Sequence, residues 1–440
     1  MMPKPLYKHY LLTLLTVVAV FNFLDRSLLA LLLEPIKQDL QLSDSQLGFL
    51  TGFSFALFYA VAGIPIARWA DRGNRNTVVS VTTVLWSFMV VLCGMVGNFT
   101  QLLLVRVGVA VGEAGCFPPA QSLISDYFDR AERPFAMAIY WMCAPVSVII
   151  AYLGGGWLAE NFGWRTAFVV MGLPGILLAI LVKLTLREPR LKQKTRTLVE
   201  QPSMKEVLGI LGKRSSFRQI VIAFCVSYFF GLGIGQWLPS FFIRSYDMRI
   251  DDLGVWMAFA WGVCGLVGGY LGGFLTTRYA AGKEALQMKG VAFIFVLCGL
   301  VFVAIYLSSN KYVALSLVAV MGALFTICNG AVFSAIQSLV DDRMRSVSIA
   351  LIFLGANLIG FGFGPIAVGV LSDLLAPVFG QESLRYSLLL FAPGYLWVAY
   401  HYWKAADMIE EDIRSLESGA GPLEDKVVVL EADTFELRVD

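Results

Sequence analysis

The chain contains about twelve apolar runs, each long enough to cross a lipid bilayer, and this feature constrains its fold most. A helix needs about 20 mostly apolar residues to cross the ~30 Å of bilayer hydrocarbon. The 440 residues are 58% hydrophobic and only 15% charged, whereas globular domains carry nearer about 25% charge. A water-soluble globular fold is therefore excluded, and the sequence predicts an all-α membrane protein with 12 transmembrane helices.

The predicted spans form two groups of six, separated by a basic stretch. The first six cover residues 11–33, 46–70, 76–96, 101–125, 134–158 and 165–186. The second six cover 218–243, 253–277, 289–307, 313–340, 346–375 and 383–404. We therefore predict an N-terminal six-helix bundle (1–186), a cytoplasmic linker (187–217), a C-terminal six-helix bundle (218–404) and an acidic cytoplasmic tail (405–440). Weak similarity between the two groups favours duplicated bundles related by a pseudo-two-fold axis.

The distribution of Lys and Arg over the loops indicates the orientation in the membrane. Positive residues accumulate in loops on the cytoplasmic side. With the N-terminus in the cytoplasm, the external loops hold only six positive residues, namely Lys37, Arg165, Arg244, Arg249, Lys311 and Arg385, out of 34 in the chain. We expect a multi-pass protein of the inner (plasma) membrane with both termini in the cytoplasm.

Charged residues inside the predicted spans are the main functional candidates, because a charge in lipid costs several kcal/mol unless it faces water or a partner. Asn22, Asp25 and Arg26 are three and four residues apart and share one face of the first span. Arg106 and Glu113 are seven residues apart and share a face of the fourth span, about 10 Å apart along its axis. Depth counting places Asp25 between Arg106 and Glu113, so contact between the two helices is expected.

Two interpretations of these charges remain open. In the functional one, Asp25 and Glu113 bind and release protons, while Arg26 and Arg106 set their proton affinity and bind an anionic substrate group. In the other, Asp25 and Arg26 form a static buried salt bridge, and Glu113 serves only helix packing.

The second half offers amides rather than charges within its spans. Those with a possible role in substrate contact are Asn329, Asn357 and Gln337, with Gln236 and Thr326 as further polar residues. Each is more often a helix contact than a ligand, so this side of a central cavity should be apolar. Several glycines between residues 355 and 369 predict that the eleventh span bends, with close helix packing as the equal alternative.

The loop after the second span resembles the cytoplasmic signature of the major facilitator superfamily. The residues concerned are Asp71, Arg72 and Arg75, together with Arg130 and Arg133 after the fourth span. The resemblance implies the major facilitator fold, with charge contacts at a cytoplasmic gate. An ordinary basic inner loop is the alternative.

The sequence also resembles the spinster branch of that superfamily over residues 10–404. The residues that carry this resemblance are Arg106, Gly108, Gly112, Glu113 and Ala114, together with Asn22, Asp25 and Arg26 and with Trp164 and Arg165. It implies a proton-coupled transporter of lysophospholipid-like or sphingosine-phosphate-like lipids. The charges of the first half and the apolar second half independently suit an amphiphile with an anionic head. Substrate identity transfers poorly between proteins of one fold.

The alternatives within this class are a proton-coupled symporter of small organic anions and an exporter of hydrophobic drugs. A channel and a membrane-embedded enzyme are disfavoured: the second half has few polar residues, and no catalytic constellation is present. His9 and His401 lie at the ends of the membrane region, and neither a phosphate-binding glycine loop nor a metal site is apparent. We expect no cofactor, no metal and no nucleic-acid partner, and a monomer in the bilayer.

Overall fold

The computed structural model describes residues 4–129, 132–189, 209, 212–340 and 344–417. Within these residues every regular element is a helix. A backbone in lipid must satisfy its own hydrogen bonds, and for a single segment only a helix does so. The predicted linker falls largely outside the described residues, as does the end of the tail, 418–440.

Eight helices make up the N-terminal half. They are α1 (Lys4–Leu40), α2 (Asp44–Thr51), α3 (Phe53–Arg72), α4 (Arg75–Cys93), α5 (Phe99–Glu113), α6 (Phe117–Tyr127), α7 (Arg133–Trp141) and α8 (Cys143–Thr185). Short breaks within a span separate α2 from α3, α5 from α6 and α7 from α8.

The C-terminal half has a similar arrangement, with π-helical and 3₁₀ segments inserted in its spans. Its elements are α10 (Ser215–Tyr228), η2 (Phe229–Gly233), η3 (Ile234–Trp237), α11 (Leu238–Tyr246), α12 (Ile250–Met257), η4 (Ala258–Val263), α13 (Cys264–Tyr279), α14 (Glu284–Leu307), α15 (Lys311–Ser338), α16 (Arg345–Gly355), η5 (Ala356–Gly362), α17 (Phe363–Phe379), η6 (Gly380–Glu382), α18 (Ser383–Leu390) and α19 (Pro393–Glu417). The segments η2, η4 and η5 are π-helical.

The helices of the described residues form ten continuous apolar segments long enough to span a membrane, and two of these contain two spans each. In α8, Gly163 has φ 83° and ψ 159°, so the helix reverses there. Few residues other than glycine adopt such a positive φ. The other double segment turns between α17 and α18, through η6. The twelve-helix fold class is confirmed, with helix ends that differ from the predicted ones by several residues.

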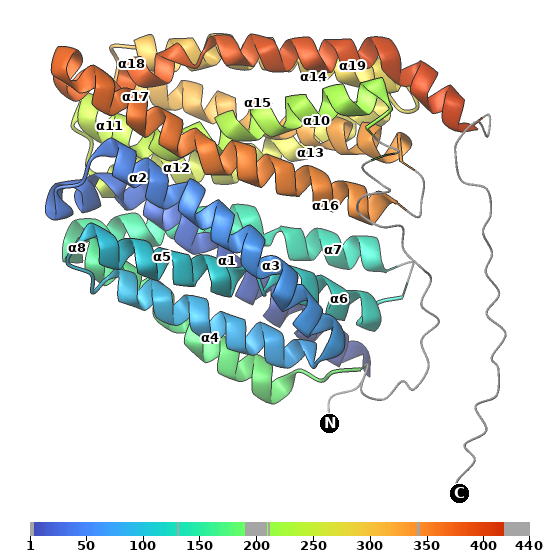
Figure 1. Ribbon diagram of the computed structural model, residues 1–440, viewed down its shortest axis with the longest axis horizontal. Helices are drawn as coiled ribbons and strands as arrows, with labels where there is room; N and C mark the ends of the chain where they lie inside the picture. The colour runs from blue at the N-terminus through green and yellow to red at the C-terminus, as the bar shows by residue number, and fades with distance from the viewer. Residues whose placement is uncertain (1–3, 130–131, 190–208, 210–211, 341–343, 418–440) are drawn as a thin grey trace, which may run out of the picture.

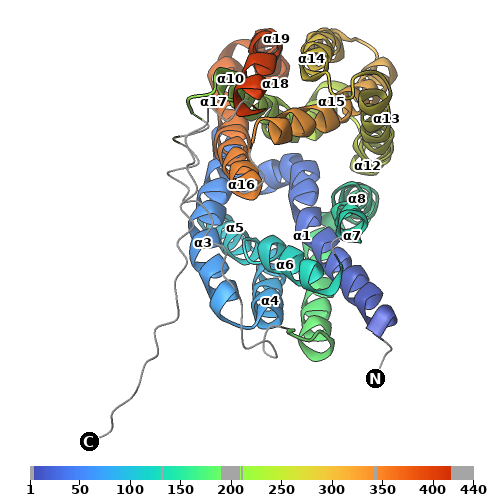
Figure 2. The ribbon, with the colours of Figure 1, turned by 90° about the vertical axis from the view of Figure 1, so that its right-hand side faces the viewer.

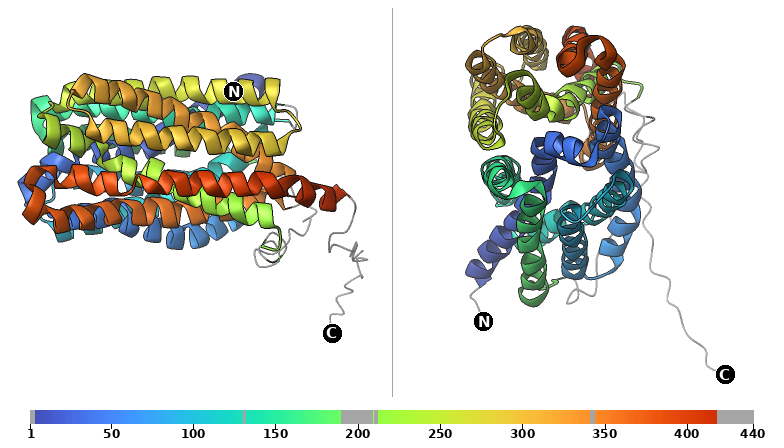
Figure 3. Two further views of the ribbon diagram at one scale, coloured as in Figure 1. Left: turned by 90° about the horizontal axis from the view of Figure 1, so that it is seen from above. Right: turned by 90° about the vertical axis from the view of Figure 1, so that its left-hand side faces the viewer.

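The two halves lie side by side, and their helices run roughly parallel to the long axis of the molecule (Figure 1). Viewed end-on, α1–α8 form one bundle and α10–α19 the other (Figure 2). The described ends of the chain, Lys4 and Glu417, belong to the same end of the molecule, which we call the terminal end; the far end is the opposite end (Figure 3).

The surface of the bundle is apolar, as expected for a chain whose solvent is lipid. Large aliphatic side chains such as Leu184, Leu300 and Val378 are at least 65% exposed. The last helix continues beyond the predicted boundary at Lys404 as far as Glu417, so the first part of the predicted tail is helical. Its residues Ile409 and Ala405 are buried, which explains the continuation.

Candidate functional site

The charged residues predicted on the first and fourth spans come together in the middle of the N-terminal half. Arg26 on α1 donates to Glu113 Oε2 on α5 through Nε (2.9 Å) and Nη2 (2.6 Å). Arg106 on α5 donates to Asp25 Oδ2 on α1 through Nη1, at 2.6 Å. The contact expected between these helices is therefore present. The neighbours Asp25 and Arg26 are not each other's ion-pair partner, because each pairs with a residue of α5.

The two carboxyl groups belong to neighbouring ion pairs, because Asp25 and Arg26 are consecutive on α1 and each pairs with a residue of α5. Asp25 Oδ1 and Glu113 Oε1 are buried and receive no hydrogen bond from any described residue. The four groups together carry two positive and two negative charges when all are ionised.

The four charged side chains differ in accessibility. Asp25, Arg106 and Glu113 are at most 2% exposed, whereas the side chain of Arg26 is 17% exposed. Arg26 is therefore the cation of the cluster that an incoming anion can reach.

Aromatic rings surround the Arg26 guanidinium. Its Cζ lies 4.6 Å from the ring centre of Phe55, 5.3 Å from Tyr59, 5.5 Å from Phe23 and 5.9 Å from Phe361. These distances allow cation–π attraction, which strengthens when water is excluded. Phe361 belongs to η5 of the C-terminal half, so this aromatic cage joins the two halves.

Phe55 also contacts the second arginine. Its ring centre lies 5.3 Å from Arg106 Cζ, so one aromatic side chain of α3 stands between the two guanidinium groups. Phe55, Tyr59 and Phe361 are not recognisable from the sequence, because the chain has 32 Phe and 16 Tyr and no spacing distinguishes these three.

The predicted amides lie in different environments. Asn22 is fully buried, and neither polar atom of its side chain has a hydrogen-bond partner among the described residues. Asn357 donates to the carbonyl of Phe353 in its own helix. Asn329 and Gln337 are exposed on α15. Asn357 therefore makes a helix contact.

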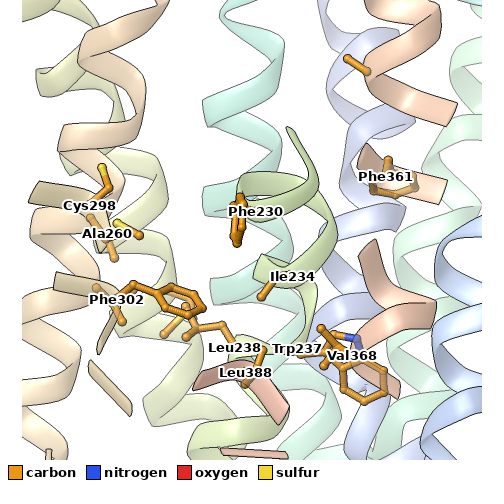
Figure 4. Close-up of a cluster of buried hydrophobic side chains, with 14 of the residues drawn as sticks. Phe230, Ile234, Trp237, Leu238, Ala260, Cys298, Phe302, Phe361, Val368 and Leu388 are labelled. Carbon is orange, nitrogen blue, oxygen red and sulfur yellow. The ribbon is translucent and has the colours of Figure 1, made fainter. Parts of the chain in front are cut away.

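The C-terminal half presents a tightly packed apolar interior beside the cluster. Figure 4 shows Phe230, Ile234 and Phe302 in this core, with Phe361 on the side toward the N-terminal half. A cavity of about 30 Å³ lies between η2, η3, η4, α14, α15 and α19, with Phe230 and Tyr395 in its lining. That volume holds about one water-sized group, so a long apolar tail needs movement of these helices to enter.

At the terminal end, the predicted gate residues have different environments. Arg75 is 1% exposed and binds Asp126 of α6 and Glu188, which follows α8, so none of these described contacts reaches the C-terminal half. Arg72 is exposed, and Arg133 donates from Nε to the Phe128 carbonyl at 3.0 Å. Arg130 and the side chain of Asp71 lie outside the described residues. Glu188 is not recognisable from the sequence as the partner of Arg75.

Near these residues, Lys8 of α1 donates to both carboxylate oxygens of Glu132, at 2.6 and 2.7 Å. This ammonium group lowers the pKa of the Glu132 carboxyl. The pair links α1 to the turn before α7, and it lies at the surface.

The hydrogen bonds and ion pairs that join described residues of the two halves are concentrated at the opposite end. There Arg244 of α11 binds Glu34 and Asp44, and Asp373 of α17 accepts from the first turn of α2. Two closely packed bundles whose polar contacts with each other lie at one end, with buried charges midway, are typical of a secondary transporter.

Comparison with known proteins agrees with this architecture. The Major Facilitator Superfamily matches residues 15–365, and the chain therefore belongs to that superfamily. A crystal structure titled as a bacterial homologue of the human lysosomal transporter spinster, in an inward-facing and unoccupied conformation, is 30% identical. It superimposes with a TM-score of 0.84 over 93% of this chain and 99% of that chain. The resemblance to the spinster branch is confirmed.

Two curated relatives are named for other kinds of transport. An MFS-type efflux pump of Mycolicibacterium smegmatis is 34% identical over 91% of this chain and 92% of its own length. A probable L-galactonate transporter of Escherichia coli is 29% identical over 86% of this chain and 84% of its own length. The protein is thus a membrane-embedded secondary transporter rather than an enzyme, with relatives of several substrate classes.

Proposed function

We propose that this protein is a proton-coupled transporter that moves an amphiphilic, anionic, lipid-like substrate by alternating access. The observation that carries the proposal is the position of Arg26. It is the accessible cation of a buried charge cluster, and its aromatic cage includes Phe361 of the apolar half. An anionic head group would bind Arg26, while an apolar tail would lie against the C-terminal half.

Proton coupling rests on Asp25 and Glu113. Asp25 Oδ1 and Glu113 Oε1 are the carboxylate oxygens of the cluster that receive no hydrogen bond from any described residue, and the two carboxyl groups belong to neighbouring ion pairs. Two carboxylates that share one site readily share one proton. The positive charges of Arg26 and Arg106 stabilise the form without that proton.

Protonation would also free the substrate cation. Arg26 makes both of its described hydrogen bonds to Glu113 Oε2. Once Glu113 is neutral, this ion pair loses its charge attraction, and Arg26 becomes available to an anionic head group. Proton and anion then favour each other's binding, which is the requirement for movement in the same direction.

We further propose that the structure is the inward-facing state of a monomer in the inner (plasma) membrane. The terminal end would face the cytoplasm, as the Lys and Arg distribution favours. The opposite end, where the halves are joined, would then be the closed external end.

The test is uptake into proteoliposomes of the purified protein with a trapped pH dye. Lysophospholipids, sphingoid phosphates, small sugar acids and hydrophobic cationic drugs are added separately. We expect acidification of the lumen with an anionic lysolipid or sphingoid phosphate. Glu113→Gln controls for leakage caused by lipids, and Glu132→Gln, at an exposed carboxylate, is its matched variant and should still transport.

The other outcomes distinguish the alternatives. A response only to sugar acids would support a symporter of small organic anions, for which the relative named as an L-galactonate transporter is the supporting observation. Alkalinisation with hydrophobic drugs alone would support a drug exporter, as the relative named as an efflux pump suggests. Equal acidification by Glu113→Gln would contradict proton coupling at this residue.

The role of Arg26 has its own test. Arg26→Ala should lower the affinity for an anionic lysolipid about tenfold or more. The affinity for an uncharged analogue of equal tail length should fall far less. Competition binding with the two lipids measures the difference. Equal loss for both lipids would assign Arg26 to structure alone.

A further inference from the structure

One buried arginine of the C-terminal half is held by two acids of the N-terminal half at the opposite end. Arg244 Nη1 and Nη2 donate to the two oxygens of Asp44, at 2.8 and 2.7 Å, and Nε donates to Glu34 Oε2 at 2.7 Å. The three side chains are 5%, 2% and 6% exposed. Charge-assisted bidentate pairs of this kind are among the strongest hydrogen bonds in proteins.

Asp44 has partners from both halves. Lys37 of α1 donates to its Oδ1 at 2.6 Å, and Ser372 of α17 donates to its Oδ2 at 2.7 Å. Asp44 is therefore the centre of the contact, and its carboxylate is satisfied only when the two halves are together.

A carboxylate of the C-terminal half also binds the start of α2. Asp373 Oδ1 accepts from the backbone N–H of Asp44 at 3.0 Å, and Oδ2 accepts from the N–H and the hydroxyl of Ser45. The first N–H groups of a helix have no partner within the helix, and a negative charge there is favourable. A residue of one half therefore caps a helix of the other.

The backbones around this contact are packed very closely. A Cβ added at Gly369 of α17 would lie 2.2 Å from the carbonyl oxygen of Asp44, and one at Gly48 of α2 would lie 2.3 Å from that of Pro365. Only glycine at these positions lets α2 and α17 approach closely enough for the side-chain contacts to form.

The contact is connected mechanically to the central charge cluster. Asp25 and Glu34 lie on the same helix, α1, nine residues apart, or about 13 Å along its axis. A change in the ion pairs of Asp25 and Arg26 that tilts α1 would therefore move Glu34 relative to Arg244.

We propose that Glu34, Lys37, Asp44, Ser45, Arg244, Ser372 and Asp373 form a latch that holds the opposite end closed and must break in each transport cycle. The proposal rests on alternating access, as part of the proposed function. In the sequence these residues appear only as charged or hydroxyl side chains near the predicted loops. Breaking the Arg244–Asp44 pair should raise the population of molecules open at this end.

The matched control is a second contact between the halves at the same end. Arg249, the residue before α12, binds Glu160 of α8 at 3.2 Å, but its side chain is 62% exposed. Exposed ion pairs contribute little, because water and salt screen them. Arg249→Gln removes the same charge from the same end and should leave the population unchanged.

The experiment measures a distance rather than transport, so it does not depend on which substrate is carried. Spin labels are placed at Gln41 and Gln381, two exposed residues of different halves at the opposite end, with the partly exposed Cys264 changed to Ser. Pulsed dipolar spectroscopy is recorded on the full chain in nanodiscs without substrate. We expect one short distance in the parent protein and in Arg249→Gln.

In Arg244→Gln, a longer-distance population should appear, at least tenfold more abundant than in the parent. Asp373→Asn, which keeps the size of the side chain and loses its charge, should give a smaller shift in the same direction. Circular dichroism and size-exclusion profiles establish that each variant is folded. Folded Arg244→Gln and Asp373→Asn with parental distance distributions would overturn the latch, as would equal opening in Arg249→Gln. Because the readout is a distance recorded without substrate, a failure of the proposed function would instead appear as absent lipid-driven acidification in the parent protein.

Discussion

The two halves of the molecule solve different problems within one fold. In the N-terminal half, four charged side chains are buried in two ion pairs between α1 and α5. In the C-terminal half, apart from Arg244 at the opposite end, the buried polar residues in the described spans are serines and glutamines, and the core is aromatic. Charges inside a membrane are costly, so the half that keeps them has a chemical reason to do so.

The halves also differ in the regularity of their helices. All three π-helical segments among the described residues, η2, η4 and η5, belong to the C-terminal half. Such segments often occur at functional sites and leave helices easier to rearrange. On the proposed function, the N-terminal half would hold the groups that bind protons and an anionic head group, whereas the C-terminal half would adapt its packing to an apolar tail.

The largest effect should come from removing ionisation in the charged half. Glu113→Gln keeps the size of the side chain next to Arg26, and it removes the carboxyl group that would bind and release a proton. We expect substrate-driven proton movement to fall by about a hundredfold or more, measured with the trapped dye. Glu132→Gln should retain it. A Glu113→Gln protein that still concentrates substrate against its gradient would refute the division of roles between the halves.

Within the cluster, the two arginines should behave differently. Arg106 is 2% exposed and pairs with Asp25, so Arg106→Ala leaves a buried carboxylate without its cation. Breaking a buried pair in this way costs about 3–5 kcal/mol. The thermal unfolding midpoint should fall clearly more in Arg106→Ala than in Arg26→Ala. Recovery in the double variant with Asp25→Asn would establish that the loss comes from the unpaired charge.

In the apolar half, packing rather than charge should dominate. A Cβ at Gly360 of η5 would lie 2.7 Å from Phe229 N and 2.8 Å from Tyr228 Cβ, whereas one at Gly269 of α13 would meet nothing within 4 Å. Overpacking costs about 1–3 kcal/mol, so Gly360→Ala should lower the unfolding midpoint. Gly269→Ala should be neutral or slightly stabilising. Similar midpoints for the two variants would argue against close η2–η5 packing.

The same contrast explains which features the sequence predicted. Span-length apolar runs identified the helices, because lipid requires them. The residues Asp25, Arg26, Arg106 and Glu113 were found because charges stand out in such runs. Their pairing was not, since helix rotation decides which side chains meet. Arg244 could not be recognised, because its burial depends on Asp44, which lies 200 positions away.

The smallest effect should come from the amides of the C-terminal half. Asn357 is only half-buried and donates from Nδ2 to the Phe353 carbonyl of its own helix at 2.8 Å. This carbonyl is an acceptor within a helix, so losing the extra donor costs little, and a leucine of similar size preserves the apolar wall. We expect Asn357→Leu to change uptake of an anionic lysolipid by less than about threefold, because a single neutral hydrogen bond contributes about 1 kcal/mol. Uptake rates over a range of lysolipid concentrations measure this. A loss as large as that of Arg26→Ala would place a polar substrate contact in the C-terminal half and end the simple division between a charged half and an apolar one.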